Sequence, residues 1–212
     1  MILANFAVIE GGDGSGTTTQ LALLKKRFEN ENGSGTPVFW ADCEPTGGPV
    51  GLLIRRILKG EITVRKETLA RLFAADRGEH LYGGGGIVER CNRGGLVVSD
   101  RYTPSSIVYQ GLECGAELPE ALNAAFPLPE LLVYLDVEAE TAMRRLEGRG
   151  GHDIFENAGF QALVRQAYQA LLPRYRGAGV RVLALEGKMP PEELAGEIWR
   201  AVGEMPIMKT AK

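Results

Sequence analysis

The stretch from Phe6 to Gln20 constrains the fold more than any other part of the chain. Phe6 to Ile9 are four apolar residues in a row, which predicts a short buried strand. Four of the six residues from Gly11 to Gly16 are glycine, and residues 20–28 then have the pattern of an amphipathic helix. A strand, a glycine turn and a helix in this order are the setting of a P-loop, in which backbone N–H groups and the helix N-terminus surround a phosphate chain.

The spacing of this turn follows the P-loop pattern except at one position. Thr18 takes the place of the Ser or Thr that reaches Mg²⁺, but Thr17 stands where the pattern has its lysine. Backbone amides can still hold phosphate, whereas the fixed positive charge is missing. A glycine turn with no ligand remains the alternative for this stretch. The candidate ATP-binding loop comprises Gly11, Gly12, Asp13, Gly14, Ser15, Gly16, Thr17, Thr18 and Thr19.

The composition of the chain excludes several classes of protein. Its 212 residues are 44% hydrophobic and 24% charged with a net charge of −3, which predicts one globular domain over residues 1–212. No basic excess indicates a nucleic-acid partner, and no apolar run is long enough for a membrane span or a signal peptide. Cys43, Cys91 and Cys114 are an odd number without metal-ligand spacing, which predicts free thiols in a reducing cytoplasm.

Apolar runs and helical periodicity alternate along the rest of the chain. They predict strands at 38–41, 96–99, 131–136 and 180–185, and helices at 51–58, 66–80, 139–146, 161–175 and 191–202. Four glycines at 83–86 should break the helix that begins at 66, which Ile87 to Asn92 could resume. This alternation predicts an α/β fold, a five-stranded parallel sheet with helices on both faces. Ligands of such sheets bind beyond the C-terminal strand ends, where the glycine turn, Glu44-Pro45 and Asp100-Arg101 fall.

Four segments in fixed order match the motifs of one enzyme family. They are Phe6–Gln20; Glu44-Pro45 with Gly51 and Arg55; Leu72–His80, reading Leu-Phe-Ala-Ala-Asp-Arg-Gly-Glu-His; and Asp100–Gly111, reading Asp-Arg-Tyr-Thr-Pro-Ser-Ser-Ile-Val-Tyr-Gln-Gly. On these segments the chain resembles thymidylate kinase, over roughly residues 5 to 200. The resemblance implies a P-loop nucleoside monophosphate kinase fold, transfer of the γ-phosphoryl group of ATP to dTMP, Mg²⁺ with ATP, a cytoplasmic location and a homodimer.

The resemblance also implies a dTMP pocket. Phe73 and Arg77 are four residues apart on one predicted helix, so that a ring can stack on the pyrimidine while a cation binds its exocyclic oxygen. Phe73 in the core and Arg77 in a surface ion pair is the alternative. Ser105, implied beside the base, could equally cap a helix. The remaining implied dTMP-binding residues are Asp13, Glu44, Pro45, Arg55, Arg101, Ser106, Tyr109, Phe155 and Glu156.

The implied catalytic residues are Asp13, near the acceptor phosphate, Arg101, as a clamp on the monophosphate, and Arg149. Arg149 belongs to a mobile lid expected at about 146–158. It is four residues from Arg145, so both could face the phosphate chain of ATP; solvated charges on a helix are the alternative reading of this pair.

The implied metal site consists of Thr18 and Asp100, whose carboxylate would support Mg²⁺ through water.

Three positions depart from the family, and all of them face phosphate. Thr17 replaces the P-loop lysine, while Cys43 and Ile154 replace arginines. Losing one preorganised donor to a developing charge costs about 10²–10³ in rate. The sequence therefore favours a dTMP kinase, with reduced activity left open. A catalytically impaired nucleotide-binding protein of the same fold is the second hypothesis. A deoxynucleoside kinase with Glu44 as its carboxylate base is the third.

Overall fold

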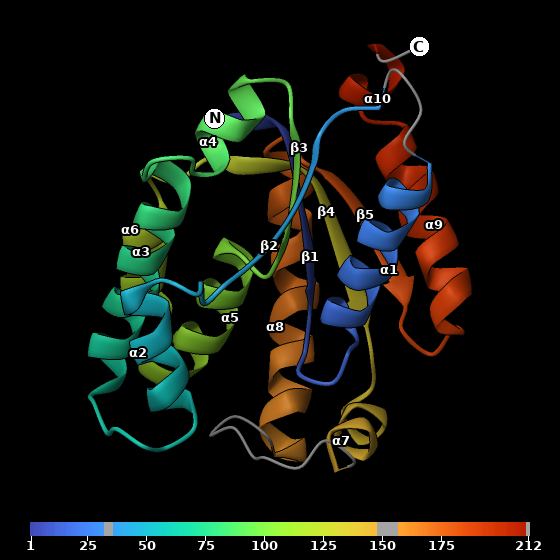
Figure 1. Ribbon diagram of the computed structural model, residues 1–212. Coiled ribbons are helices and arrows are strands. Elements are labelled where there is room, and N and C mark those ends of the chain that lie inside the picture. The colour runs from blue at the N-terminus through green and yellow to red at the C-terminus, as the bar shows by residue number, and fades with distance from the viewer. Residues whose placement is uncertain (32–35, 148–156, 211–212) are drawn as a thin grey trace.

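The computed structural model describes residues 1–31, 36–147 and 157–210, and its centre is a five-stranded parallel sheet (Figure 1). The strand order is β2-β3-β1-β4-β5. The strands are β1 (Ile2–Gly11), β2 (Phe39–Cys43), β3 (Leu96–Asp100), β4 (Leu128–Asp136) and β5 (Arg181–Glu186). All neighbouring pairs are parallel, so the predicted fold class is confirmed.

Helices cover both faces of the sheet and enclose two hydrophobic cores (Figure 1). On one face, α1 (Thr17–Asn30) and α9 (Pro191–Gly203) bury leucines and isoleucines against alternate residues of the central strands. On the other face lie α2 (Pro49–Leu58), α3 (Lys66–Tyr82), α4 (Ile87–Asn92), α5 (Thr103–Cys114) and α8 (Ala158–Gly177). The remaining helices are α6 (Glu117–Asn123), α7 (Ala139–Glu147) and α10 (Pro206–Thr210). Burial on both faces explains why the central strands are apolar runs rather than alternating patterns.

Three helices, α5, α6 and α10, were not predicted from the sequence. No helix range was predicted directly after β3, yet α5 begins at Thr103 with Pro104 in its first turn, where proline is well tolerated. The short helix α6 was missed as well. Ser105 lies inside α5, and Tyr102 is the N-cap residue, so the alternative reading of Ser105 as a cap is wrong.

The glycines at 83–86 break the helix as predicted, since α3 ends at Tyr82 and α4 begins at Ile87. The turn between β1 and α1 also needs glycine for its backbone. Gly14 has φ +76°, and a Cβ there would lie 3.1 Å from the carbonyl carbon of Ala142. Gly16, the N-cap of α1, has φ +97°, a conformation that side-chain-bearing residues rarely adopt.

Part of the predicted lid cannot be compared with the structure, because residues 148–156 lie outside the described residues. Arg149, Phe155, Glu156 and the substituted Ile154 belong to that segment, so their expected roles stay predictions. All three cysteines are free, as predicted. Within 1–31, 36–147 and 157–210, no helix combines the length and apolar character that a membrane crossing requires.

Candidate functional site

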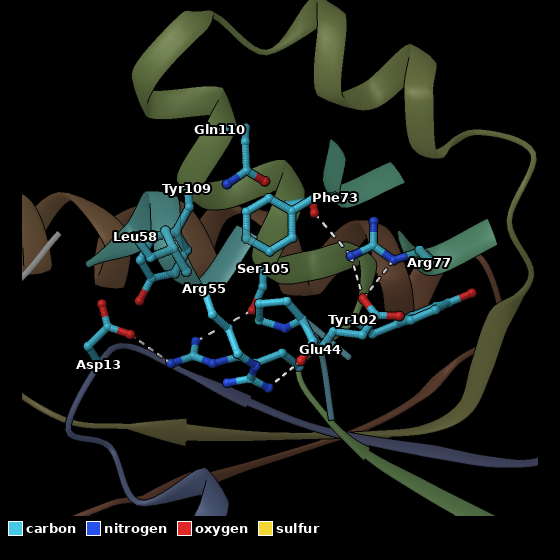
Figure 2. A pocket seen from close by; sticks show the side chains of 13 residues that line it. Asp13, Glu44, Arg55, Leu58, Phe73, Arg77, Tyr102, Ser105, Tyr109 and Gln110 are labelled. Carbon is cyan, nitrogen blue, oxygen red and sulfur yellow. Dashed lines mark hydrogen bonds and ion pairs between the residues drawn. The ribbon is translucent and has the colours of Figure 1, made fainter. Parts of the chain in front are cut away.

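A pocket opens on the α2, α3 and α5 side of the sheet, beyond the C-terminal ends of β1, β2 and β3 (Figure 2). It brings together ten residues implied by the family resemblance: Asp13, Glu44, Pro45, Arg55, Phe73, Arg77, Arg101, Ser105, Ser106 and Tyr109. Figure 2 shows Asp13 and Arg77 at opposite ends of the pocket, with Phe73 between them. The pocket therefore has one end at the glycine loop and one end at a buried arginine.

Arg101 links the glycine loop to this pocket. Its guanidinium donates to the Gly11 carbonyl oxygen, lies 3.0 Å from Asp13 Oδ1 and is 3.3 Å from the Tyr168 hydroxyl. Its backbone has φ +75°, an unusual value for a side chain of this size, and is held by Arg101 N donating to the Ile9 carbonyl. Strained backbone at a strand end is typical of functional sites. An arginine fixed in this way can bind a phosphate in bidentate fashion.

Asp13 is held by two elements distant in sequence. Besides Arg101, Gln161 on α8 donates from Nε2 to Asp13 Oδ2 at 2.8 Å, and the Asp13 backbone N–H donates to Gln161 Oε1 at 3.0 Å. The Asp13 side chain is 25% exposed. Its carboxylate lines the pocket, next to Arg101.

The other end of the pocket is built around Arg77. This side chain is 1% exposed, and it donates from Nε and Nη2 to Glu44 Oε2 at 3.0 and 2.7 Å. Nη2 also donates to Ser106 Oγ at 3.0 Å, and Nη1 donates to Asn123 Oδ1. The alternative of a surface ion pair is therefore wrong, because the pair with Glu44 is buried beside the pocket. Phe73, half-buried one turn earlier on α3, lines the same pocket.

The two serines of α5 face different partners. Ser106 contacts Arg77, whereas Ser105 donates to Glu10 Oε2 at 2.6 Å and lies 3.4 Å from Arg101 Nη1. Tyr109 lies between these ends, with the Arg101 guanidinium carbon 5.6 Å from the centre of its ring. The structure thus groups Ser105 with the glycine-loop end and Ser106 with the Arg77 end.

Thr18 and Asp100 meet as the sequence analysis expected for a metal site. Thr18 Oγ1 donates to Asp100 Oδ2 at 2.6 Å. Asp100 Oδ1 is buried and has no hydrogen-bond partner among the residues that the structure describes. Mg²⁺ is commonly held by one or two protein oxygens together with phosphate oxygens and water. A hydroxyl and a carboxylate with one uncommitted oxygen at a P-loop fit that ion.

A second pocket lies on the other side of the glycine loop. It is lined by loop and α1 residues together with Arg145 and the segment around Gly187. Arg145 donates to the Gly187 carbonyl oxygen at 2.8 Å and lies 3.5 Å from that of Gly14. Arg145, exposed on α7, thus contacts the glycine loop and the segment after β5, and its role toward ATP stays a prediction. The two pockets lie on either side of the glycine loop.

The substituted positions differ in their surroundings. Thr17 is 5% exposed at the first position of α1 and brings no charge to the loop. Cys43 is exposed, but Arg55 Nη2 lies 3.6 Å from its sulfur and also donates to the Pro45 carbonyl. A guanidinium is therefore present beside Cys43, whereas α1 places no cationic side chain beside Thr17.

Sequence reasoning missed four residues of the site. Gln110 lines the first pocket, and its Oε1 is buried without a partner among the described residues, so it could accept from a ligand. Gln161 holds Asp13, Glu10 contacts Ser105, and His80 contacts Glu44. Glu10, His80 and Gln110 stood within the quoted motifs, but Tyr168 and Glu44, which contact Glu10 and His80, are distant from them in sequence.

Glu10 lies at the end of β1, fully buried beneath Arg101. Its carboxylate accepts from Tyr102 N, Ser105 Oγ and Tyr168 Oη. Burial raises the pKa of Glu10 to about 7, against the opposing charge of Arg101 and the hydrogen bonds from Ser105 and Tyr168. The Glu10 carboxyl therefore takes up its proton near neutral pH in the folded protein, but only at lower pH in the unfolded chain.

This raised pKa predicts a loss of stability as the pH increases. Between the ordinary carboxyl pKa of 4.5 and about 7 the folded state binds a proton that the unfolded state has released, so the free energy of unfolding falls across this range. Glu10→Gln keeps the shape but cannot ionise. We expect the wild type to lose roughly 3 kcal/mol more than Glu10→Gln between pH 4.5 and 8. Urea unfolding of both proteins measures this, and parallel pH profiles would contradict it.

Comparison with known proteins gives a consistent result. The family model described as thymidylate kinase matches residues 9–194. A homologue from Treponema pallidum named thymidylate kinase is 41% identical over 176 residues, covering 82% of each chain. One from Aeropyrum pernix is 41% identical over 207 residues, covering 92% of this chain and 94% of its own. One from Pyrobaculum aerophilum is 37% identical over 195 residues, covering 91% and 93%.

Proposed function

The chain belongs to the thymidylate kinase family, and from this we propose that it transfers the γ-phosphoryl group of ATP to dTMP, giving ADP and dTDP. The observation that carries the proposal is the placement of Arg101, which touches the glycine loop at Gly11 and Asp13 and also lines the acceptor pocket. A phosphate held there lies next to the loop that would hold the phosphates of ATP. The pocket on the far side of the loop, with Arg145, is the proposed donor site.

The proposed reaction is an in-line transfer that depends on positioning and charge neutralisation. A phosphate oxygen of dTMP attacks the γ-phosphorus, and the bond from phosphorus to the β–γ bridging oxygen breaks as ADP leaves. Arg101 and Arg55 would hold the acceptor phosphate, and Asp13 would fix the Arg101 guanidinium. When bound, Mg²⁺ would supply positive charge to the β- and γ-phosphates. Thr18 and Asp100 would hold it.

The base would lie at the Arg77 end of the pocket. Of the five N–H groups of Arg77, four are committed to Glu44, Ser106 and Asn123 within the described residues, which leaves one on Nη1 for an exocyclic oxygen. Phe73 would stack on the pyrimidine, and the Gln110 amide is a further candidate contact. Phe155, Glu156 and Arg149 belong to the proposed lid at about 146–158, in a single kinase domain spanning residues 1–212.

The test is a coupled assay of ADP release with ATP, Mg²⁺ and dTMP, at enzyme concentrations high enough to detect slow turnover. ADP release that requires dTMP supports the proposal. Release with thymidine but not with dTMP would favour a deoxynucleoside kinase. The geometry argues against that reading, because both oxygens of Glu44 are engaged, one by Arg77 and the other by His80, and its side chain is 2% exposed.

A nucleotide-binding protein without activity is the second candidate function. One observation favours it: Thr17 places an uncharged, buried side chain where a lysine would bridge the β- and γ-phosphates. Such a protein would bind dTMP but release no ADP. The assay and a binding measurement together distinguish the two functions.

Binding of dTMP should raise the melting temperature, because a ligand that binds only the folded state stabilises it. Phe73→Ala is expected to remove most of this shift, since it deletes the ring between the two ends of the pocket. Leu163→Ala, which truncates an exposed apolar residue of α8, is the control and should keep the shift. Thermal unfolding with and without millimolar dTMP measures both. The absence of any shift in the wild type would show that dTMP is not the ligand.

The proposed enzyme is a cytoplasmic homodimer. In support, α3 packs against both α2 and α5, and each of these three helices exposes one large apolar side chain: Leu52, Tyr82 and Leu112. Exposed apolar side chains on neighbouring helices are common at subunit interfaces. Light scattering combined with size-exclusion chromatography tests the dimer.

A further inference from the structure

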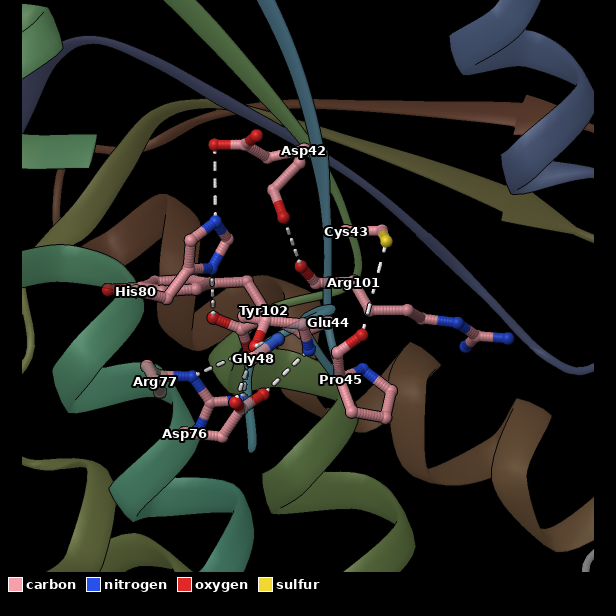
Figure 3. Close-up of polar contacts among 12 residues, drawn as sticks. Asp42, Cys43, Glu44, Pro45, Gly48, Asp76, Arg77, His80, Arg101 and Tyr102 are labelled. Carbon is pink, nitrogen blue, oxygen red and sulfur yellow. Dashed lines mark hydrogen bonds and ion pairs between the residues drawn. The ribbon is translucent and has the colours of Figure 1, made fainter. Parts of the chain in front are cut away.

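A chain of alternating charges leads from the edge of the sheet to the Arg77 end of the acceptor pocket. His80 is its centre: Nδ1 lies 3.2 Å from Glu44 Oε1, and Nε2 lies 3.1 Å from Asp42 Oδ2. Figure 3 shows the imidazole between these two carboxylates, with Arg77 beyond Glu44. At the outer end, Arg90 Nη1 donates to Asp42 Oδ2 at 2.7 Å.

Each member of this chain is positioned by its neighbours. Arg90 lies against the Trp40 ring, with its guanidinium carbon 4.5 Å from the ring centre. The His80 side chain is 9% exposed and the Glu44 side chain 2% exposed, so water does little to screen their contact. The Glu44 backbone N–H donates to the Asp100 carbonyl at 3.0 Å, which ties the same residue to the end of β3.

The geometry gives Glu44 and His80 defined roles. Oε2 of Glu44 accepts two bonds from Arg77, so its orientation fixes the plane of that guanidinium. Oε1 faces His80 Nδ1, so His80 fixes the orientation of the carboxylate in turn. A site is precise when the partners behind the ligand-contacting side chains are themselves fixed by hydrogen bonds.

We propose that His80 is a positioning residue for pyrimidine recognition: it donates from Nδ1 to Glu44 and from Nε2 to Asp42, and thereby holds the Glu44–Arg77 pair in the orientation that binds the base. The inference rests on the proposed function, since it concerns the acceptor dTMP. It adds a role for a residue that does not line the pocket and does not touch the ligand.

Both ring nitrogens of His80 face carboxylates, which requires the doubly protonated imidazolium. Burial disfavours this charged form, but the hydrogen bonds and charges of Asp42 and Glu44 outweigh it and raise the pKa of His80 to about 9. The charged groups around the ring are Asp42 from β2, Glu44 after it, Arg90 from α4 and Arg77 from the same helix. His80 thus stays charged throughout the neutral range.

Two substitutions separate the two contacts of His80. The amide nitrogen of asparagine reaches about the position of Nδ1, and that of glutamine reaches about the position of Nε2. His80→Asn therefore keeps a donor to Glu44, while His80→Gln keeps one only to Asp42. We expect His80→Gln to raise the KM for dTMP about tenfold, as for loss of one charge-assisted hydrogen bond, and His80→Asn to raise it no more than about twofold.

The other kinetic constants distinguish positioning from general damage. The KM for ATP and kcat should change little in either variant, since the chain of charges does not reach the glycine loop. Arg71→Gln, an exposed change on α3 that also removes one positive charge, is the control and should behave as the wild type. Equal KM values for dTMP in both His80 variants would overturn the inference. So would a KM for ATP that changes in parallel with the KM for dTMP.

Failure of the proposed function would look different, because the wild type itself would then release no ADP with dTMP. If a His80 variant does not fold, the wild type alone provides the test by ¹⁵N NMR, since the chain has only two histidines. His80 should be doubly protonated at pH 8, and dTMP should shift its Nδ1–H more than its Nε2–H. A neutral ring at pH 8, or signals unaffected by bound dTMP, would contradict the role.

Discussion

Arg101→Ala is expected to lower kcat by about 10²–10³, the usual effect of removing one preorganised donor to a phosphate that carries charge in the transition state. The reason lies in the position of Arg101 between the two pockets. Its guanidinium contacts the Gly11 carbonyl and Asp13 on one side and lines the acceptor pocket on the other. Arg101→Ala removes both the positive charge and the contact that fixes the distance between the ATP site and the dTMP site.

The KM values should separate these effects. Because Arg101 would hold the acceptor phosphate, the KM for dTMP should increase, whereas the KM for ATP should change little. Arg101→Lys keeps the charge but not the planar pair of donors, so it should recover only part of the rate. Arg200→Ala on α9, a side chain 68% exposed in a pair with Glu197, is the control for losing an arginine. A rate of Arg101→Ala within threefold of the wild type would exclude the proposed clamp.

The stability of Arg101→Ala needs its own measurement. Asp13 would keep its two hydrogen bonds with Gln161, so the glycine loop should stay in place. The Arg101 backbone has positive φ, which alanine tolerates no better than arginine, so the strain is unchanged. We therefore expect the melting temperature of Arg101→Ala to decrease by only a few degrees. The variant should lose activity while remaining folded.

Much of the fold could be predicted because it depends on local patterns. The four apolar residues before the glycine loop and the runs at 96–99 and 131–136 became the three central strands, and the glycines at 83–86 ended α3. The helix α5 was not predicted, because Pro104 and the two serines after it are residue types that are also common in turns. Proline in the first turn of a helix has the same sequence signature as proline in a turn.

The site was predictable only where its residues lie in the motifs that carry the family resemblance. Phe73 and Arg77 share a helix face, and Thr18 and Asp100 were joined through the family resemblance. By contrast, Gln161 contacts Asp13 across 148 residues, Tyr168 contacts Glu10 across 158, and His80 contacts Glu44 across 36. No periodicity links such pairs, since their distance is set by how α8 and α3 pack on the sheet. The partners behind the substrate-facing side chains therefore emerged only from the structure.

Thr17→Lys is expected to increase kcat by about tenfold or more, with little change in the KM for dTMP. The backbone around Thr17 has P-loop features: Gly16 precedes it in the left-handed conformation, α1 starts at Thr17, and Thr18 already contacts Asp100. A lysine there would bring positive charge to the β- and γ-phosphates, where negative charge develops during transfer.

The charges already present near the loop limit the size of this gain. Arg145 donates to the Gly187 carbonyl and lies 3.5 Å from that of Gly14, so it contacts the loop from α7 without a carboxylate partner in the hydrogen bonds described for it. If Arg145 already serves the phosphates, Arg145→Ala should lower kcat in the wild type and much less in Thr17→Lys. Comparing Arg145→Ala alone with Arg145→Ala in the Thr17→Lys background shows whether Arg145 and the introduced lysine can substitute for each other.

Size and charge must be separated at position 17, because Thr17 is 5% exposed and a longer side chain has to leave its buried site. Thr17→Met has similar length without charge, so it should give no gain in kcat, and its melting temperature shows the cost of the longer chain. A gain in both variants would attribute the effect to packing. No activity in the wild type or in Thr17→Lys, together with a dTMP-induced rise in melting temperature, would favour the nucleotide-binding protein. The missing charge at Ile154 would then be the reason, because Thr17→Lys does not restore it, whereas the Arg55 guanidinium already lies beside Cys43.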